Sequence, residues 1–354
     1  MKIDLKNIHA VGQMNLKAKG YFYVGGHYKG EPGKTHMCGQ MFVEVFVPEH
    51  ITCPYPVIMF HGAGQTNLNW LGTPDGRKGW ADYFVEKGYV VYLAEQPARG
   101  RSAYHPEEDG PRTYHPVEII ENRFTSNDGT WPKARLHTQW PENGRYIGSE
   151  IFDQFASAQV EYIPSNRRSQ ELVQDAAGAL LEKTGPAILL THSQAGPFGW
   201  NIADAYPEQV KGIIAVEPFG PPFSRDLSND HPKNYGISDL PLHFEPEVQS
   251  PEDFKLELYS SDQEGEVDGW VVKNQEYTLP RFQNIPILFL TSEASYHSDY
   301  DHLTSYVLNQ WKVAHDFVRL EDVGICGNSH MMMMEMNNLE IADFIMKWMQ
   351  NNIR

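Results

Sequence analysis

The chain of 354 residues has few cysteines and few basic residues, which excludes several classes of protein. Its three cysteines, Cys38, Cys53 and Cys326, are widely spaced and form neither a disulfide framework nor a CxxC zinc motif. Basic residues are scarce: 29 Lys and Arg against 46 Asp and Glu give a formal net charge of −17. Because nucleic acids and anionic membranes are bound by positive patches, this balance argues against both partners. The sequence leaves open whether Cys38 and Cys53 pair.

Long apolar runs are missing as well. Residues 1–6 (MKIDLK) lack the apolar core of a secretory signal peptide, and no stretch approaches the length of a membrane-spanning helix. We therefore expect a soluble cytoplasmic protein whose partner is a small molecule. The sequence leaves open whether the protein forms a homodimer.

What the sequence does contain is an alternation of short apolar stretches with amphipathic ones, which predicts an α/β protein. Residues 20–48 predict an N-terminal antiparallel hairpin. The further predicted strands are 56–60, 89–94, 187–192, 210–216, 286–291 and 315–320, and the predicted helices are 80–88, 171–182, 194–206, 303–311 and 331–349. A strand–helix–strand unit over residues 56–94 predicts parallel strands. We expect one domain over residues 1–354.

Two segments do not follow this alternation. Residues 103–165 carry aromatic side chains among prolines and glycines, and residues 218–282 are rich in proline, aspartate and glutamate. Aromatic residues in irregular chain predict a cap or lid over the mouth of a site. For residues 103–165, a surface insertion that packs its aromatic rings against the sheet helices explains the pattern equally well.

The stretch around Ser193 has the pattern of a nucleophile elbow, a tight turn between a strand and a helix that exposes a serine hydroxyl. Such a turn also points backbone N–H groups at an anion that forms there. The usual motif is G-x-S-x-G, whereas this chain has Thr191 and Ala195 in place of the two glycines. By itself, the stretch also fits a buried serine that begins an ordinary helix.

Three further features accompany the serine pattern, one before it in the chain and two after it. The HGAG turn at His61–Gly64 ends a predicted strand, Glu217 ends the strand after the serine unit, and His330 lies in a glycine-rich loop after the last strand. The order serine, acid, histidine is that of α/β-hydrolases. The chemistry needs these residue types because serine attacks, histidine takes its proton, and a carboxylate stabilises the imidazolium.

The acid has competitors one strand later. Many α/β-hydrolases carry their acid at that position, where this chain offers Glu293, Asp299 and Asp301. We expect Glu217 to serve His330, with Glu293 as the main alternative.

Taken together, the chain resembles a bacterial and fungal subgroup of α/β-hydrolase-fold carboxylesterases whose triad acid is a glutamate after the strand next to the elbow. The resemblance runs from residue 20 to about residue 348. The matching motifs are GQMFVEVFVP at 39–48, HG at 61–62, TPDGRKGW at 73–80, RGRS at 99–102, HSQ at 192–194, EASYH at 293–297 and GNSHMMM at 327–333. It implies an α/β-hydrolase fold with a mostly parallel central sheet, helices on both faces, the N-terminal hairpin and cap insertions at 103–165 and 218–282.

The resemblance also implies the roles of individual residues. Ser193 carries over as the nucleophile, Glu217 as the acid and His330 as the base. The backbone N–H groups of Ala63 and Gln194 carry over as the donors of the oxyanion hole.

We thus expect a serine hydrolase that cleaves a carboxylic ester of a small or medium-sized substrate through an acyl-enzyme, with no cofactor and no metal. The expected substrate contacts are His61, Gly62, Gly64, His192 and Phe219. The same triad is able to open a lactone or an amide. A different class of function, cyclisation without hydrolysis or ligand binding alone, also stays open.

Overall fold

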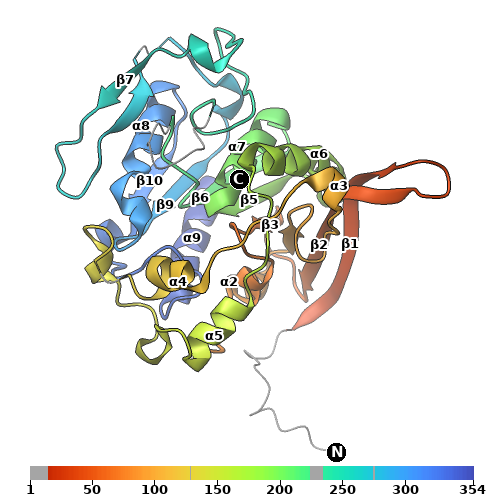
Figure 1. The fold of residues 1–354 in the computed structure, drawn as a ribbon, viewed down its shortest axis with the longest axis horizontal. Helices are drawn as coiled ribbons and strands as arrows, with labels where there is room; N and C mark the ends of the chain where they lie inside the picture. The colour runs from red at the N-terminus through yellow and green to blue at the C-terminus, as the bar shows by residue number, and fades with distance from the viewer. Residues whose placement is uncertain (1–14, 128, 224–233, 274–275) are drawn as a thin grey trace, which may run out of the picture.

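A single mixed sheet forms the centre of the protein (Figure 1). The computed structural model describes residues 15–127, 129–223, 234–273 and 276–354. In chain order the strands of this sheet are β1 (Leu16–Lys29), β2 (His36–Pro48), β3 (Val57–Phe60), β4 (Val91–Glu95), β5 (Ala187–His192), β6 (Val210–Val216), β9 (Ile287–Thr291) and β10 (Asp316–Arg319). Their order across the sheet is β1-β2-β4-β3-β5-β6-β9-β10. The pairs β1–β2 and β2–β4 are antiparallel and the remaining pairs are parallel, as the sequence predicts.

Helices cover both faces of the sheet because the central strands are apolar on both sides. In β5, Ile188 and Leu190 join one buried cluster, whereas Leu189 joins the other. This alternation follows from the two-residue period of a strand. The helices are α2 (Trp80–Glu86) and α9 (Asn338–Asn352) against the first cluster, and α6 (Asn166–Thr184), α7 (Gly196–Ala205) and α8 (Asp301–Gln310) against the second.

The two irregular segments differ in structure. Within 103–165 the chain forms only short helical pieces: α3 (Pro106–Asp109), α4 (Val117–Ile120), η2 (Glu121–Thr125), η3 (Ala134–Leu136), η4 (Glu142–Gly144) and α5 (Glu150–Ser157). Residues 218–282 contain a hairpin that the sequence analysis did not predict, β7 (Leu256–Tyr259) with β8 (Gly269–Val272). Figure 1 shows α4 and α5 of the first segment (yellow to yellow-green) in the lower part of the view, α3 on the right, and the second segment (teal) in the upper part.

The predicted helix over 331–349 is wrong in its first part. Met331–Met334 form a buried turn, and the helix begins at Asn338. The cause is a set of side-chain bonds that fold the turn back: the amide of Asn338 donates to the carbonyl of Met333 at 3.1 Å, and the buried carboxylate of Glu335 accepts from the backbone of Ser329. The methionines are core residues nevertheless.

The cysteines are free thiols. Cys38 is buried, Cys53 is half-buried and Cys326 is exposed. Cys38 and Cys53 do not form a disulfide with each other in the structure. In the part of the chain that the structure describes, no helix combines the length and the apolar character needed to cross a membrane.

Candidate active site

Ser193 lies at the turn between β5 and the helical segment that begins with η5 (Ser193–Ala195) and continues as α7. Its φ angle is 55°, in the left-handed region that a non-glycine residue rarely adopts. Such backbone strain costs about 1–3 kcal/mol and persists only where the surrounding structure enforces it. The expected strand–turn–helix geometry around this serine is therefore present.

The unusual Thr191 is accommodated from the helix side of the turn. A Cβ on Gly199 would lie 3.2 Å from Cγ2 of Thr191, closer than most real contacts allow. The missing side chain at position 199 thus leaves room for the threonine that stands where glycine is usual. Gly196 has a similar role, since a Cβ there would lie 2.4 Å from Cβ of Pro218 in the loop after β6.

The structure brings Glu217 and His330 into direct contact. Nδ1–H of His330 donates to Oε2 of Glu217 at 2.6 Å, and both side chains are buried. The carboxylate also accepts from the backbone N–H of Ser292 at 2.9 Å, and the hydroxyls of Ser292 and Ser295 donate to it as well. A buried charge held by several donors keeps its position, and this one orients the imidazole.

The competing acids have other partners. Oε2 of Glu293 accepts from the backbone N–H of Gly327 at 2.8 Å, and Asp301 pairs with Nδ1 of His297 at 3.0 Å. His297 stacks on the ring of His330 with centroids 4.7 Å apart. Because Glu293 holds the loop before His330 and not the imidazole itself, the geometry favours Glu217 as the histidine's partner.

A metal at the same place would need atoms that are already engaged. Glu217, His297 and His330 each offer one ligand atom within 4.8 Å of the others. Both oxygens of Glu217, however, already accept hydrogen bonds, Oε1 from Ser292 and Oε2 from Ser295 and His330. The residues therefore fit a histidine–carboxylate pair better than a metal centre.

Ser193 and His330 line one cavity of about 350 Å³. Its wall also contains Gly62, Ala63, Gln65, Thr113, His115, Arg123, Phe124, Tyr162, Pro164, Asn166, His192, Gln194, Phe219 and Tyr296. Six of these residues, from Thr113 to Pro164, belong to the segment 103–165, whereas Phe219 alone comes from 218–282. A cavity of this volume suits a small or medium-sized organic molecule.

The two predicted oxyanion donors both line the cavity. Gln194 directly follows the serine at the start of the helical segment, and Ala63 lies in the turn after β3. Among the described residues, the backbone N–H of Ala63 donates no hydrogen bond and is therefore available to a bound anion. Arg99 is buried and donates to the carbonyl of Gly62 at 3.3 Å and to the side-chain oxygen of Gln194 at 3.3 Å, so it connects the turn after β3 to the residue after the serine.

The residues predicted to contact substrate fall into two groups. Gly62, His192 and Phe219 line the cavity, whereas His61 and Gly64 do not. His61 is completely buried under the loop, where its Nε2 accepts from the backbone of Gln96 at 3.4 Å. Burial, with the nearby Arg99 charge, lowers the pKa of His61 to about 3 and keeps it neutral.

His192 supports the loop that carries the other histidine. Its Nε2–H donates to the carbonyl oxygen of His330 at 3.0 Å, and its ring is buried. Burial lowers the pKa of His192 well below its usual value, so the ring stays a neutral donor. Burial, the His297 ring and the Arg123 guanidinium likewise lower the pKa of His330, which keeps it free to accept a proton.

The segment 103–165 reaches the site through η2, a one-turn π-helix. Helices of this type are rare and occur often at functional sites. The turn places the ring of Phe124 against His330, with centroids 5.6 Å apart, and Arg123 over the ring of Tyr296 at 5.2 Å. Trp140 and Phe152 from the same segment are instead buried in the core.

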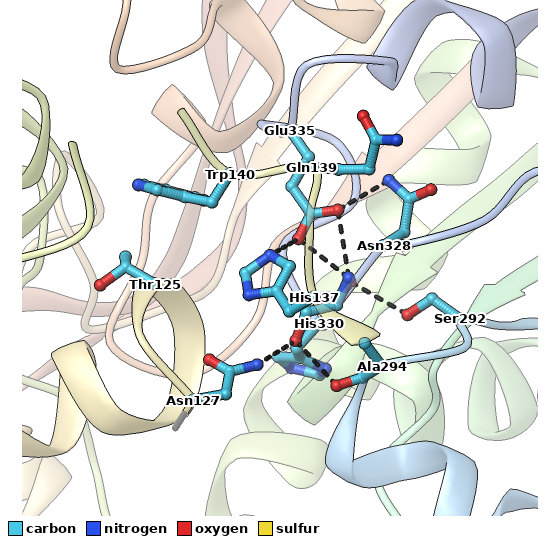
Figure 2. A network of polar contacts seen from close by, with 12 residues as sticks. Thr125, Asn127, His137, Gln139, Trp140, Ser292, Ala294, Asn328, His330 and Glu335 are labelled. Carbon is cyan, nitrogen blue, oxygen red and sulfur yellow. Dashed lines mark hydrogen bonds and ion pairs between the residues drawn. The ribbon is translucent and has the colours of Figure 1, made fainter. Parts of the chain in front are cut away.

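A buried network fixes the residue that precedes His330 (Figure 2). Glu335 is fully buried and accepts from the backbone N–H of Ser329 at 2.9 Å, from the amide of Asn328 at 2.7 Å and from Nε2–H of His137 at 2.9 Å. The amide of Asn127 donates to the hydroxyl of Ser329 at 2.9 Å. The histidine loop is thus held by residues from the segment 103–165 on one side and by its own carboxylate on the other.

The sequence analysis missed two residues of this site. Tyr296 lines the cavity and its hydroxyl interacts with the side chain of Ser193, and Glu335 anchors the histidine loop. Burial raises the pKa of Tyr296, so its hydroxyl stays protonated and is able to donate. Tyr296 belongs to the EASYH motif, which was the available signal for it, whereas Glu335 lies two residues after the GNSHMMM motif.

Comparison with known proteins agrees with this architecture. The chain is 41% identical over 333 residues, 93% of its length and 89% of the relative's, to the probable secreted lipase phiG of Fungal sp. (strain ATCC 74256). A bacterial esterase solved at atomic resolution superposes with a TM-score of 0.62 at 22% identity, covering 97% of this chain and 98% of the esterase. No protein-family model matches the chain. The strand order and the second likeness show the α/β-hydrolase fold.

The comparison corrects the expected compartment. A cytoplasmic location was expected, yet the 41% identical relative is named a secreted protein, which points to an extracellular location. The expectation relied on the composition of the first six residues. Secretory leaders are removed from mature chains, so the first residues of a sequence do not decide the compartment by themselves.

Proposed function

The chain belongs to the α/β-hydrolase family that includes the lipase phiG, and from this premise we propose that it is a serine hydrolase that cleaves carboxylic esters through an acyl-enzyme. The observation that carries the proposal is the 2.6 Å contact between Glu217 and His330, together with a strained Ser193 that lines the same cavity as His330. A cavity of about 350 Å³ supports a substrate of small or medium size.

In the proposed reaction, the Ser193 hydroxyl attacks the ester carbonyl and its proton passes to the free ring nitrogen of His330. Glu217 keeps the other nitrogen protonated and stabilises the imidazolium that forms. The histidine then donates its proton to the leaving alcohol, which departs as the acyl-enzyme forms. Water attacks this ester in a second round, again with His330 as base, and releases the acid and Ser193.

The negative oxygen of each tetrahedral intermediate would be stabilised by two backbone N–H groups, those of Ala63 and Gln194. Removing one such donor typically costs about 2.7–4 kcal/mol of barrier. The free N–H of Ala63 and the position of Gln194 at the start of a helical segment support this assignment. Arg99 supports it indirectly, since it donates to the carbonyls of Gly62 and Gln65 near Ala63 and to the side chain of Gln194.

The proposal is tested by labelling and turnover on the purified protein. A fluorophosphonate probe should label the wild type at Ser193, and p-nitrophenyl butyrate should be hydrolysed with an initial burst if the acyl-enzyme accumulates. Ser193→Ala should remove both label and turnover. Ser157→Ala, an exposed serine at the end of α5 that does not line the cavity, is the matched control and should keep both.

A wild-type protein that takes no label, or a Ser193→Ala variant that hydrolyses the ester at the wild-type rate, would overturn the proposal.

A further inference from the structure

The cavity beside Ser193 has a charge opposite to that of the whole protein. The chain has a formal net charge of −17, yet no aspartate or glutamate is among the described residues that line the cavity. Arg123 is the one arginine or lysine among those residues. The lining residues of this cavity thus include one guanidinium and no carboxylate, although the protein as a whole is acidic. This is the electrostatic character of an anion-binding site.

Arg123 is the only lining residue described here whose charge is certain at neutral pH. Burial and the charges of Arg123 and Arg99 lower the pKa of His115 to about 4, so its ring is neutral. The pKa values of His192 and His330 are likewise lowered by burial. An arginine keeps its charge at every pH at which such an enzyme works.

The guanidinium of Arg123 has no carboxylate partner among the described residues. Its recorded contact is the face of the Tyr296 ring, 5.2 Å from the ring centroid. Arg167, by contrast, is an exposed arginine that forms an ion pair, with Glu171 at 3.1 Å. A guanidinium presents five N–H donors that match a carboxylate in a bidentate manner, and at Arg123 these donors are open to the cavity.

We propose that Arg123 forms an anion subsite beside Ser193, so that the enzyme prefers esters that carry a carboxylate a few bonds from the ester group. Tyr296 links the two, because its ring lies under the Arg123 guanidinium at 5.2 Å and lines the same cavity as Ser193. The subsite therefore belongs to the cavity that holds the reacting carbonyl. The inference rests on the proposed ester hydrolysis and adds the substrate class to it.

The rigid support of Arg123 makes the subsite selective. It lies in the π-helical turn η2, whose neighbouring residue Phe124 packs on His330 and whose end is tied down by Thr125, which donates to the carbonyl of Arg145 at 2.6 Å. A positive charge on a fixed backbone selects the position of the substrate's carboxylate as well as its presence.

The test compares pairs of esters of equal size that differ in charge. The monoethyl esters of succinic, glutaric and adipic acid carry a carboxylate on the acyl side. In their neutral counterparts this carboxylate is replaced by a primary amide, while the ethyl ester is kept. Acetate esters of hydroxy acids and of hydroxy amides place the same difference on the alcohol side. Released ethanol or acetate gives kcat/KM for each member of a pair.

We expect the wild type to favour the carboxylate member by about tenfold in at least one set, at one preferred chain length. In Arg123→Gln this ratio should fall to about one, and in Arg123→Lys part of it should remain because the charge stays but the planar fork is lost. Sodium chloride at high concentration should reduce the wild-type ratio. Arg135→Gln, an exposed arginine of the same segment that does not line the cavity, should keep the wild-type ratio.

A wild type that hydrolyses the neutral members and shows no charge preference in either set overturns the subsite and leaves the proposed hydrolase intact. A preference that is equal in wild type and Arg123→Gln also overturns it. Failure of the proposed function is a separate result, since Ser193→Ala would then hydrolyse the neutral esters as fast as the wild type.

Discussion

Two buried histidine–glutamate pairs lie close together in this protein, and they are placed for different tasks. His330 donates to Glu217 at 2.6 Å, and His137 donates to Glu335 at 2.9 Å, with both carboxylates completely buried. The His330 ring lines the cavity together with Ser193, whereas Nδ1 of His137 is buried without a described partner. A buried histidine–glutamate pair therefore does not by itself indicate a catalytic role. The surroundings of the second ring nitrogen distinguish a catalytic pair from a structural one.

The other partners of the two carboxylates sharpen this difference. Glu217 accepts from Ser292 and Ser295 in the loop after β9, so it is fixed independently of the histidine that it orients. Glu335 accepts from the backbone of Ser329 and thereby holds the loop on which His330 lies. Glu217 thus positions the imidazole of His330, whereas Glu335 positions the backbone at Ser329.

The largest effect is expected when the first pair loses its charge. Glu217→Gln keeps the size of the side chain but removes the negative charge that stabilises the imidazolium, and the matching change in a serine protease triad lowers kcat about 10⁴-fold. We expect a loss of about 10³–10⁴-fold in kcat on p-nitrophenyl butyrate. Circular dichroism should show an unchanged fold.

Glu293→Gln is the matched control for this change. Glu293 accepts from the backbone N–H of Gly327, so the variant should mainly lower the melting temperature. If Glu293→Gln harms turnover more than Glu217→Gln does, the acid is assigned to the wrong residue.

The second pair should respond to Glu335→Gln mainly in stability. The amide has one acceptor oxygen, so donors from Ser329, Asn328 and His137 would lose partners in a buried site. Breaking such a buried pair costs about 3–5 kcal/mol, and a displaced histidine loop should lower kcat about 10–100-fold. Calorimetry and ester turnover measure the two effects. A variant with the wild-type melting temperature and the turnover of Glu217→Gln would abolish the distinction between the pairs.

A smaller effect is expected from the histidine of the second pair. His137→Phe keeps a ring but removes the donor to Glu335, whose bonds to Ser329 and Asn328 remain. We expect a loss of about 1–3 kcal/mol in the free energy of unfolding and less than about a threefold change in kcat. His137→Gln, which retains an N–H donor, should recover part of the stability. A loss of turnover without a loss of stability would give His137 a role in the reaction.

The smallest effect concerns the pKa of His330. The Arg123 charge lowers this pKa, so Arg123→Gln should raise it and move the acid limb of the kcat/KM profile to higher pH. The shift should be small, because Arg123 is exposed and screened by solvent and salt. Profiles on a neutral ester at low and high salt measure it. A shift to lower pH would contradict the assigned sign.

The fold and the central residues could be predicted from the sequence because their signals are local. The apolar runs of β3, β5 and β6 are each continuous in the chain, and Ser193, Glu217 and His330 each end or follow such a run. Residues at the carboxyl ends of parallel strands meet at one edge of the sheet, so their proximity follows from topology.

The missed features depend on partners that are distant in sequence. His137 and Glu335 are 198 residues apart, and nothing in the local pattern around either one indicates the other. The turn at Met331–Met334 has the apolar composition of a helix and becomes a turn because Glu335 is bonded to Ser329 and Asn328. The hairpin β7–β8 was missed for another reason, since each of its strands has only four residues and gives too short a pattern.

The clearance between Thr191 and Gly199 restricts the order in which this turn could have changed. A methyl group at 199 needs the space that the threonine fills, so Gly199→Ala is disfavoured while Thr191 remains. A chain that first acquires glycine at 191 passes through an intermediate with room to spare, and alanine at 199 is then allowed. Replacing Gly199 by a larger residue is therefore easier after Thr191 has become glycine than while the threonine remains.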